Sequence, residues 1–167
     1  MKNSRLIIVT LIILMFGIVS CGNSQSPSKE PEQQEAPKSK AVAVEGKVIN
    51  MDKQMFIDKV FDYTTNSNVW VYKGDKPCII DFYADWCRPC RMVAPIMEEL
   101  AETYKGQIVV YKVDTDVQRE LAGSLGIRNL PSVLYCPMQG KPQMSQGALP
   151  KEQFDAIVKD FLLNNNN

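Results

Sequence analysis

The chain contains, at residues 78–90, the run Cys78-Ile79-Ile80-Asp81-Phe82-Tyr83-Ala84-Asp85-Trp86-Cys87-Arg88-Pro89-Cys90. Its first seven residues are apolar at nearly every position, which is typical of a central strand buried on both faces. The last two cysteines stand three positions apart, so they can close a small disulfide ring and open it again. If a helix begins at Cys87, its dipole and its unpaired backbone N–H groups stabilise a thiolate there. Because the thiolate is the form that attacks disulfides, the run predicts a reactive redox dithiol.

The Cys-x-x-Cys spacing also occurs in zinc sites and in haem attachment sites. A zinc site needs a second pair of cysteine or histidine ligands at short spacing. This chain has no histidine, and its other cysteines are scattered, at Cys21, Cys78 and Cys136. Haem attachment needs a histidine directly after the motif, where this chain has Arg91. The pattern favours redox chemistry and predicts no metal, and no Gly-rich nucleotide loop is present, so we expect no cofactor.

The first forty residues predict targeting. Lys2 and Arg5 precede a mostly apolar stretch, residues 6–19, which is short for a membrane span. Cys21 follows at a position that resembles a bacterial lipobox, in which the cysteine is lipidated; an ordinary secretory signal is the alternative. Residues 22–40 lack aromatic side chains, so we expect a flexible tether. The predicted organisation is a lipoprotein signal peptide (1–20), a lipidated cysteine with its linker (21–40) and one domain (41–167).

Periodicity and turn residues divide the domain into strands and helices. β-prone segments are expected at residues 42–49, 69–72, 78–84, 108–113, 132–136 and 143–146, with the last two forming a hairpin. Helices are expected after an N-cap at Asp52, at 87–104 with a kink at Pro95, at 117–125 and at 151–163. This alternation predicts an α/β domain with a mixed sheet and helices on both faces.

Several of these segments together resemble the thioredoxin family. The residues that carry the resemblance are Asp81 to Pro95, Tyr111-Lys112-Val113-Asp114, Gly126 to Ser132 and Gly147-Ala148. They look like the family's active-site strand and kinked helix, its third strand, its cis-proline loop and the turn before its last helix. The resemblance spans residues 48–163 and implies the thioredoxin fold, a central sheet flanked by helices with the dithiol at a helix N-terminus.

The resemblance implies a role for each residue of the site. Cys87 is the attacking thiolate, exposed at the helix start, and Cys90 is the resolving thiol that closes the Cys87–Cys90 disulfide. Asp81 is a buried acid or base that takes the proton from Cys90, and burial should raise its pKa towards neutral. A cis bond before Pro131 brings backbone groups beside Cys87, where a client strand can pair with them. The expected substrate-binding residues are Trp86, as a half-exposed apolar platform, Pro131 and its neighbour Leu130.

Three further residues are predicted to modulate the dithiol, namely Arg88, Pro89 and Lys112. Arg88 stands where ordinary thioredoxins have glycine. As a solvent-facing guanidinium it should favour the Cys87 thiolate by about 1 kcal/mol or less, and a neutral surface substitution is the alternative. Lys112 matches a family lysine near the buried aspartate, and a solvated lysine at a strand end is its alternative.

Cys78 and Cys136 have two interpretations. If their strands are antiparallel neighbours, as in the family, Cys78 begins one and Cys136 ends the other, so the two can lie opposite each other. Two small buried side chains are favoured over a second disulfide, because the geometry of a disulfide is demanding.

These features predict a thiol–disulfide oxidoreductase that reduces disulfides in client proteins. An isomerase or oxidase is an alternative, because direction depends on the reduction potential and the electron donor; a non-catalytic peptide-binding module is another. The electrons must come from an upstream dithiol partner, which the resemblance implies is membrane-bound. Loss of Lys2 and Arg5 takes the formal charge from zero to about −2, too little to suggest nucleic-acid binding. We expect a monomer in the periplasm, tethered through lipidated Cys21 or else soluble there.

Overall fold

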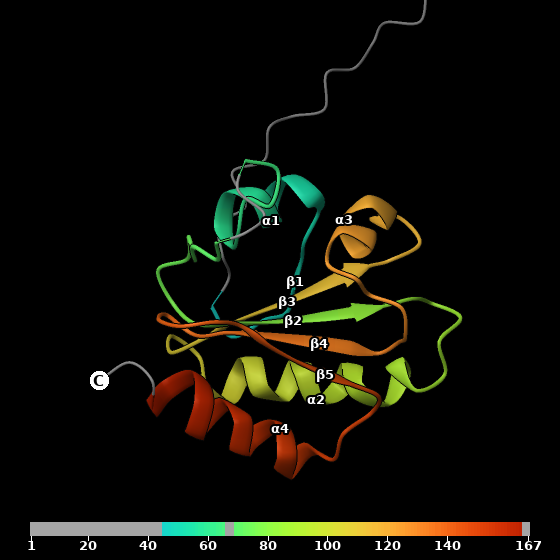
Figure 1. The fold of residues 1–167 in the computed structure, drawn as a ribbon. Coiled ribbons are helices and arrows are strands. Elements are labelled where there is room, and N and C mark those ends of the chain that lie inside the picture. The colour runs from blue at the N-terminus through green and yellow to red at the C-terminus, as the bar shows by residue number, and fades with distance from the viewer. Residues whose placement is uncertain (1–44, 66–68, 165–167) are drawn as a thin grey trace, which may run out of the picture. The chain divides into compact units, whose positions relative to one another are not determined.

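A five-stranded mixed sheet is the framework of the computed structural model, which describes residues 45–65 and 69–164 (Figure 1). Its strands are β1 (Ile49–Asn50), β2 (Cys78–Tyr83), β3 (Val109–Asp114), β4 (Ser132–Cys136) and β5 (Gln143–Gln146). They lie in the order β1-β3-β2-β4-β5. β2 is central, parallel to β3 and antiparallel to β4, and all but its last residue are buried. The predicted central strand is thus confirmed.

Helices cover both faces of the sheet, and each face has its own apolar core. The helices α1 (Lys53–Lys59) and α3 (Arg119–Ser124) lie on one face; α2 (Cys90–Thr103) and α4 (Lys151–Ile157) lie on the other (Figure 1). Because successive residues of a strand point to opposite faces, Ile80 and Phe82 of β2 pack on the α1 side and Ile79 on the α2 side. Asp81 shares the α2 side with Ile79. The predicted α/β architecture is confirmed.

The helix boundaries differ from the predicted ones in ways that bear on the site. Asp52 caps α1 as predicted, since its Oδ1 accepts a hydrogen bond from the Met55 N–H at 2.7 Å. The regular turns of α2 begin at Cys90 instead of Cys87, because residues 87–89 form a turn ahead of the helix. Pro95 lies inside α2 and has no N–H to donate to the preceding turn. The third helix is shorter than predicted, and the last continues from α4 as a π-helix, Val158–Leu163.

Two predicted β-prone segments are corrected by the structure. The segment at residues 42–49 is represented by β1 alone, and residues 42–44 lie outside the described part of the chain. Residues 69–72 form no strand. There the ring of Trp70 packs against Phe61 with centroids 4.6 Å apart, while the valines on either side of Trp70 are exposed. Aromatic packing beside the end of α1 therefore replaces strand pairing.

The predicted signal peptide, linker and lipidated Cys21 lie outside the described residues and stay predictions. Within residues 45–65 and 69–164, no helix has both the length and the apolar character that crossing a membrane requires.

Candidate active site

The two cysteines of the motif lie where the chain passes from β2 into α2. They form a disulfide with Cα atoms 5.3 Å apart, so the structure shows the oxidised form. The turn that holds them is closed by a hydrogen bond from the Cys87 N–H to the Ala84 carbonyl, at 3.0 Å. The Cys90 N–H donates to Cys87 Sγ at 3.2 Å, the spacing of an N-cap bond. When the disulfide is reduced, a backbone N–H beside this sulfur can stabilise a thiolate by hydrogen bonding to it.

The reactive sulfur is less accessible than the resemblance implies. An exposed Cys87 was expected, but only 3% of this residue is exposed, so that prediction is wrong for the oxidised form. Its side chain packs with Ala84 and Cys90 and against Tyr83 and Leu130. Cys87 is covered partly by the turn after β2 and partly by the loop before Pro131. A client disulfide must therefore approach Cys87 by seating itself on this small apolar surface.

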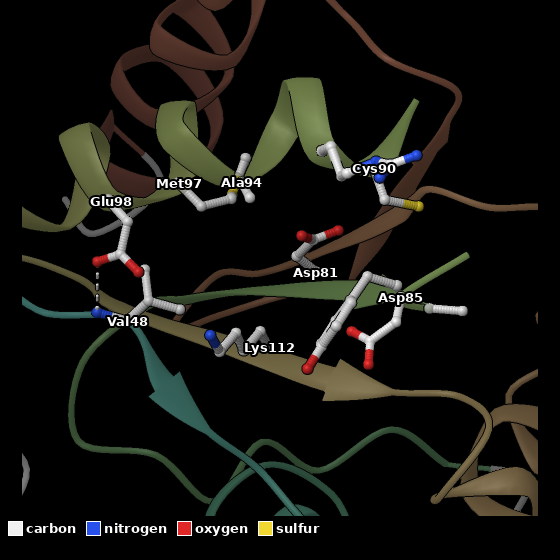
Figure 2. Close-up of a pocket in the computed structure, with 11 residues that line it drawn as sticks. Val48, Asp81, Asp85, Cys90, Ala94, Met97, Glu98 and Lys112 are labelled. Atoms are coloured by element: carbon white, nitrogen blue, oxygen red, sulfur yellow. Dashed lines mark hydrogen bonds between the residues drawn. The ribbon is translucent and has the colours of Figure 1, made fainter. Parts of the chain in front are cut away.

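Asp81 is a buried carboxylic group on the face of β2 that looks towards α2 (Figure 2). It is 3% exposed, and its Oδ1 has no hydrogen-bond partner. Burial raises the pKa of Asp81 to about 7, and the positive charge of Lys112 opposes that rise. The predicted direction of the pKa shift is confirmed, and Lys112 stands beside Asp81 in the β2–β3 register. A group that titrates near neutral pH can accept and return a proton during turnover.

A cavity of about 230 Å³ joins this carboxyl group to the resolving cysteine. In Figure 2 the Asp81 carboxyl group points into the space below α2, with Cys90 at one end and Lys112 along the floor. A cavity of this size with charged side chains in its wall has room for water, through which a proton can pass between Cys90 and Asp81. Sequence reasoning missed the other charged groups of its wall, Asp85, Arg91 and Glu98. The helical spacing from Cys90 to Ala94, Met97 and Glu98 was the available signal.

The Leu130–Pro131 peptide bond is cis, as the resemblance implies. The Pro131 carbonyl already accepts a hydrogen bond from the Gly147 N–H at 2.8 Å, which joins the loop to the chain after β5. Among the described residues, no hydrogen bond uses the backbone N–H or C=O of Leu130. Since Leu130 also packs against Cys87, its backbone groups are the ones left for an extended client strand.

Of the remaining predicted site residues, Trp86, Arg88 and Pro89 lie on the rim and Lys112 lies in the cavity wall. Trp86 is 69% exposed, more than the half-exposed platform predicted, and its Nε1 donates to Asp116 Oδ2 at 2.8 Å. Arg88 and Pro89 are both exposed, so the predicted solvent-facing position of Arg88 is confirmed. Lys112 is half-buried, with its Nζ 5.9 Å from the centre of the Tyr83 ring. The structure therefore favours the modulating interpretation of Lys112 over the solvated one.

The two remaining described cysteines are buried, free thiols that lie opposite each other in the β2–β4 register, Cys78 and Cys136. The Val109 N–H donates to the carbonyl of Pro77, the residue before β2, so the backbone of Pro77 faces β3. Because successive residues of a strand direct their backbone groups to opposite sides, the N–H and C=O of Cys78 point towards β4. The two cysteines therefore occupy a hydrogen-bonded position of the ladder, where the Cβ atoms of facing residues are typically about 5.5 Å apart, farther than the roughly 4.5 Å that a disulfide spans. Burial also raises the pKa of the Cys136 thiol, which keeps it protonated.

Within residues 45–65 and 69–164, no three side chains of the metal-binding types gather at one place. The charged groups around the dithiol act on protons and on sulfur. They comprise the buried Asp81 with Lys112 beside it, the exposed Arg88, and the other charged residues of the cavity wall, Asp85, Arg91 and Glu98. This arrangement can hold one sulfur as a nucleophile and deprotonate the other.

Comparison with known proteins agrees with this chemistry. The thioredoxin family model matches residues 59–160. A thioredoxin of Borreliella burgdorferi is 45% identical over 113 residues, 68% of this chain and 96% of that protein. Thioredoxin 1 of Nostoc sp. is 44% identical over 92 residues, 55% of this chain and 86% of that protein. The crystal structure of chloroplastic thioredoxin z matches with a TM-score of 0.55 and 29% identity, over 68% of this chain and 92% of that one.

Proposed function

Because this chain belongs to the thioredoxin family and is a thioredoxin-type disulfide reductase, we propose that it reduces the disulfides of client proteins outside the cytoplasm. The observation that carries the reaction is the cavity that joins Cys90 to a buried carboxyl group with a pKa of about 7. A module that only held peptides would have no use for an ionisable group buried at this cost.

The reaction begins with Cys87. Its thiolate attacks one sulfur of the client disulfide, so that a Cys87–client disulfide forms and the client's other sulfur leaves as a thiolate. Asp81 accepts the Cys90 proton through the cavity, and the Cys90 thiolate then attacks Cys87 Sγ. The second client sulfur leaves, and the Cys87–Cys90 disulfide of this structure is formed. Two electrons pass from the dithiol to the client, and both client thiolates take up protons.

The client is proposed to bind as an extended strand. The free N–H and C=O of Leu130 can pair with its backbone next to the reacting sulfur. Trp86 and the apolar surface around Cys87 offer contact for side chains on either side of the client cysteine. These contacts support protein disulfides as substrates in preference to small-molecule disulfides.

We propose a membrane-tethered location through a lipidated Cys21. Its support is the sequence alone, namely Lys2 and Arg5, the apolar stretch at residues 6–19 and the cysteine that follows. In that location the oxidised enzyme is recycled by an upstream dithiol, which we propose is membrane-bound. An oxidase or isomerase would need a client disulfide to be formed or moved, so the reduction potential of the Cys87–Cys90 pair separates the alternatives.

A trapping experiment tests the proposed reaction. In the full chain, Cys90→Ser leaves Cys87 able to attack but unable to be released, so mixed disulfides with clients should accumulate in the compartment where the protein resides. The double variant Cys87→Ser/Cys90→Ser is the matched control and should trap none. If the single variant traps no more protein than the double variant, the chain does not act by attack of Cys87 on client disulfides.

The location has its own test. Wild type and Cys21→Ala are expressed in a bacterium and fed a labelled fatty acid, and the cells are then fractionated. We expect label and membrane association for wild type, with loss of both for Cys21→Ala. A wild-type protein that is unlabelled and found among soluble periplasmic proteins would identify the N-terminal segment as an ordinary secretory signal.

A further inference from the structure

The arginines of this protein are used differently from its lysines. Within residues 45–65 and 69–164, every ion pair is made by a lysine: Lys53, Lys73, Lys76, Lys151 or Lys159. The arginines of that part of the chain form no ion pair, and all are exposed: Arg88, Arg91, Arg119 and Arg128. Arginine is the side chain best suited to bind a carboxylate through two parallel hydrogen bonds. The guanidinium groups of these four arginines are therefore available to an acidic partner.

Two of these arginines share a cavity beside the dithiol. Arg119, at the start of α3, and Arg128, in the loop before the cis bond, line a space of about 270 Å³. Trp86 and Leu130 line the same space. Leu130 also packs against Cys87 and has free backbone groups, so the cavity adjoins the place proposed for the client strand.

The charge of this cavity is not cancelled from within. Arg119 Nε donates to the backbone carbonyl of Asp116 at 3.0 Å, which orients the guanidinium and leaves its terminal N–H groups free. The Asp116 carboxylate points towards Trp86, and its Oδ2 accepts a hydrogen bond from Trp86 Nε1. Neither contact removes positive charge from Arg119, and Arg128 has no hydrogen bond or ion pair in the described chain.

We propose that Arg119 and Arg128 form a subsite for a glutamate or aspartate side chain that flanks the reacting cysteine of a client. The inference rests on the proposed function, because the client strand must pair beside Leu130 for its carboxylate to reach the cavity. The carboxylate lies between the two guanidinium groups, and its aliphatic stem packs on the exposed ring of Trp86. Clients whose disulfides have acidic neighbours are then reduced in preference to neutral or basic ones.

Peptide substrates test the subsite. Each peptide carries one cysteine joined by a disulfide to a chromophoric thiol, with glutamate placed in turn at each of two positions before and after the cysteine and glutamine elsewhere. At one position we expect glutamate to raise kcat/KM about threefold to fivefold over glutamine at low ionic strength, mainly through KM. The gain should disappear in Arg119→Gln/Arg128→Gln and should shrink as salt is added.

The matched control is Lys105→Gln/Lys141→Gln, which removes the same charge from exposed side chains at the opposite end of the sheet. It should keep the preference for glutamate. Equal rates for glutamate and glutamine at all positions overturn the subsite while leaving the reductase intact. A preference that survives in the arginine double variant, or is lost in the lysine control, also overturns it. Failure of the wild type to reduce any of the peptides overturns the proposed function, and the subsite with it.

Discussion

Replacing Asp81 with asparagine should remove a pH-dependent cost of folding. Burial raises the pKa of Asp81 from 3.8 to about 7, and these roughly three pKa units correspond to about 4 kcal/mol. Because the pKa is higher in the folded state, the folded protein binds more protons than the unfolded chain between these two pH values. The associated stability is fully present below pH 3.8 and is lost as the pH rises through about 7. At alkaline pH the wild type therefore carries a penalty of up to about 4 kcal/mol that Asp81→Asn lacks.

Guanidinium unfolding of the oxidised protein across the range from acid to alkaline pH measures this difference. The free energy of unfolding of Asp81→Asn minus that of the wild type should grow by about 3 to 4 kcal/mol as the pH rises. Asp160→Asn, which removes an exposed carboxylate, is the control and should show no such growth. A constant difference between Asp81→Asn and wild type would refute the reasoning. In insulin-disulfide reduction, the same variant should slow resolution at neutral pH.

Three further changes have expected outcomes. Lys112→Gln removes the charge that lowers the pKa of Asp81, so the pH profiles of stability and of disulfide reduction should both move to higher pH. Arg88→Gly should raise the pKa of Cys87 by less than about one unit, since the guanidinium is exposed and screened; the pH dependence of Cys87 alkylation measures this. Asp52→Ala removes the N-cap of α1 and should lower the free energy of unfolding by about 1 kcal/mol, without changing disulfide reduction.

The features of the site that the sequence predicts are those that a single segment of the chain determines. The apolar run of β2 fixes Asp81 in a buried strand, and a buried carboxyl group without a partner must have a raised pKa. The cis bond before Pro131 followed only from the resemblance, because nothing local in an X-Pro sequence distinguishes cis from trans.

The rest depends on segments that meet only in the folded protein. The burial of Cys87 requires Leu130, which is supplied by a loop more than forty residues away. The Asp81–Lys112 neighbourhood requires the parallel register of β2 and β3, and the cavity adds one face of α2. The segment at residues 69–72 has strand-like composition, but Trp70 packs on Phe61, a contact that its composition does not reveal, and the segment pairs with no strand.

The position of Cys78 and Cys136 has a consequence for how the protein handles electrons. They lie at the end of β2 away from the motif, and the strand between spans about 17 Å at roughly 3.3 Å per residue. Sealed in the apolar core on the other face of the sheet, they cannot scramble with the exchanging pair. Among the described residues, only the Cys87–Cys90 pair therefore exchanges, and it stores one pair of reducing equivalents without forming shuffled disulfide isomers.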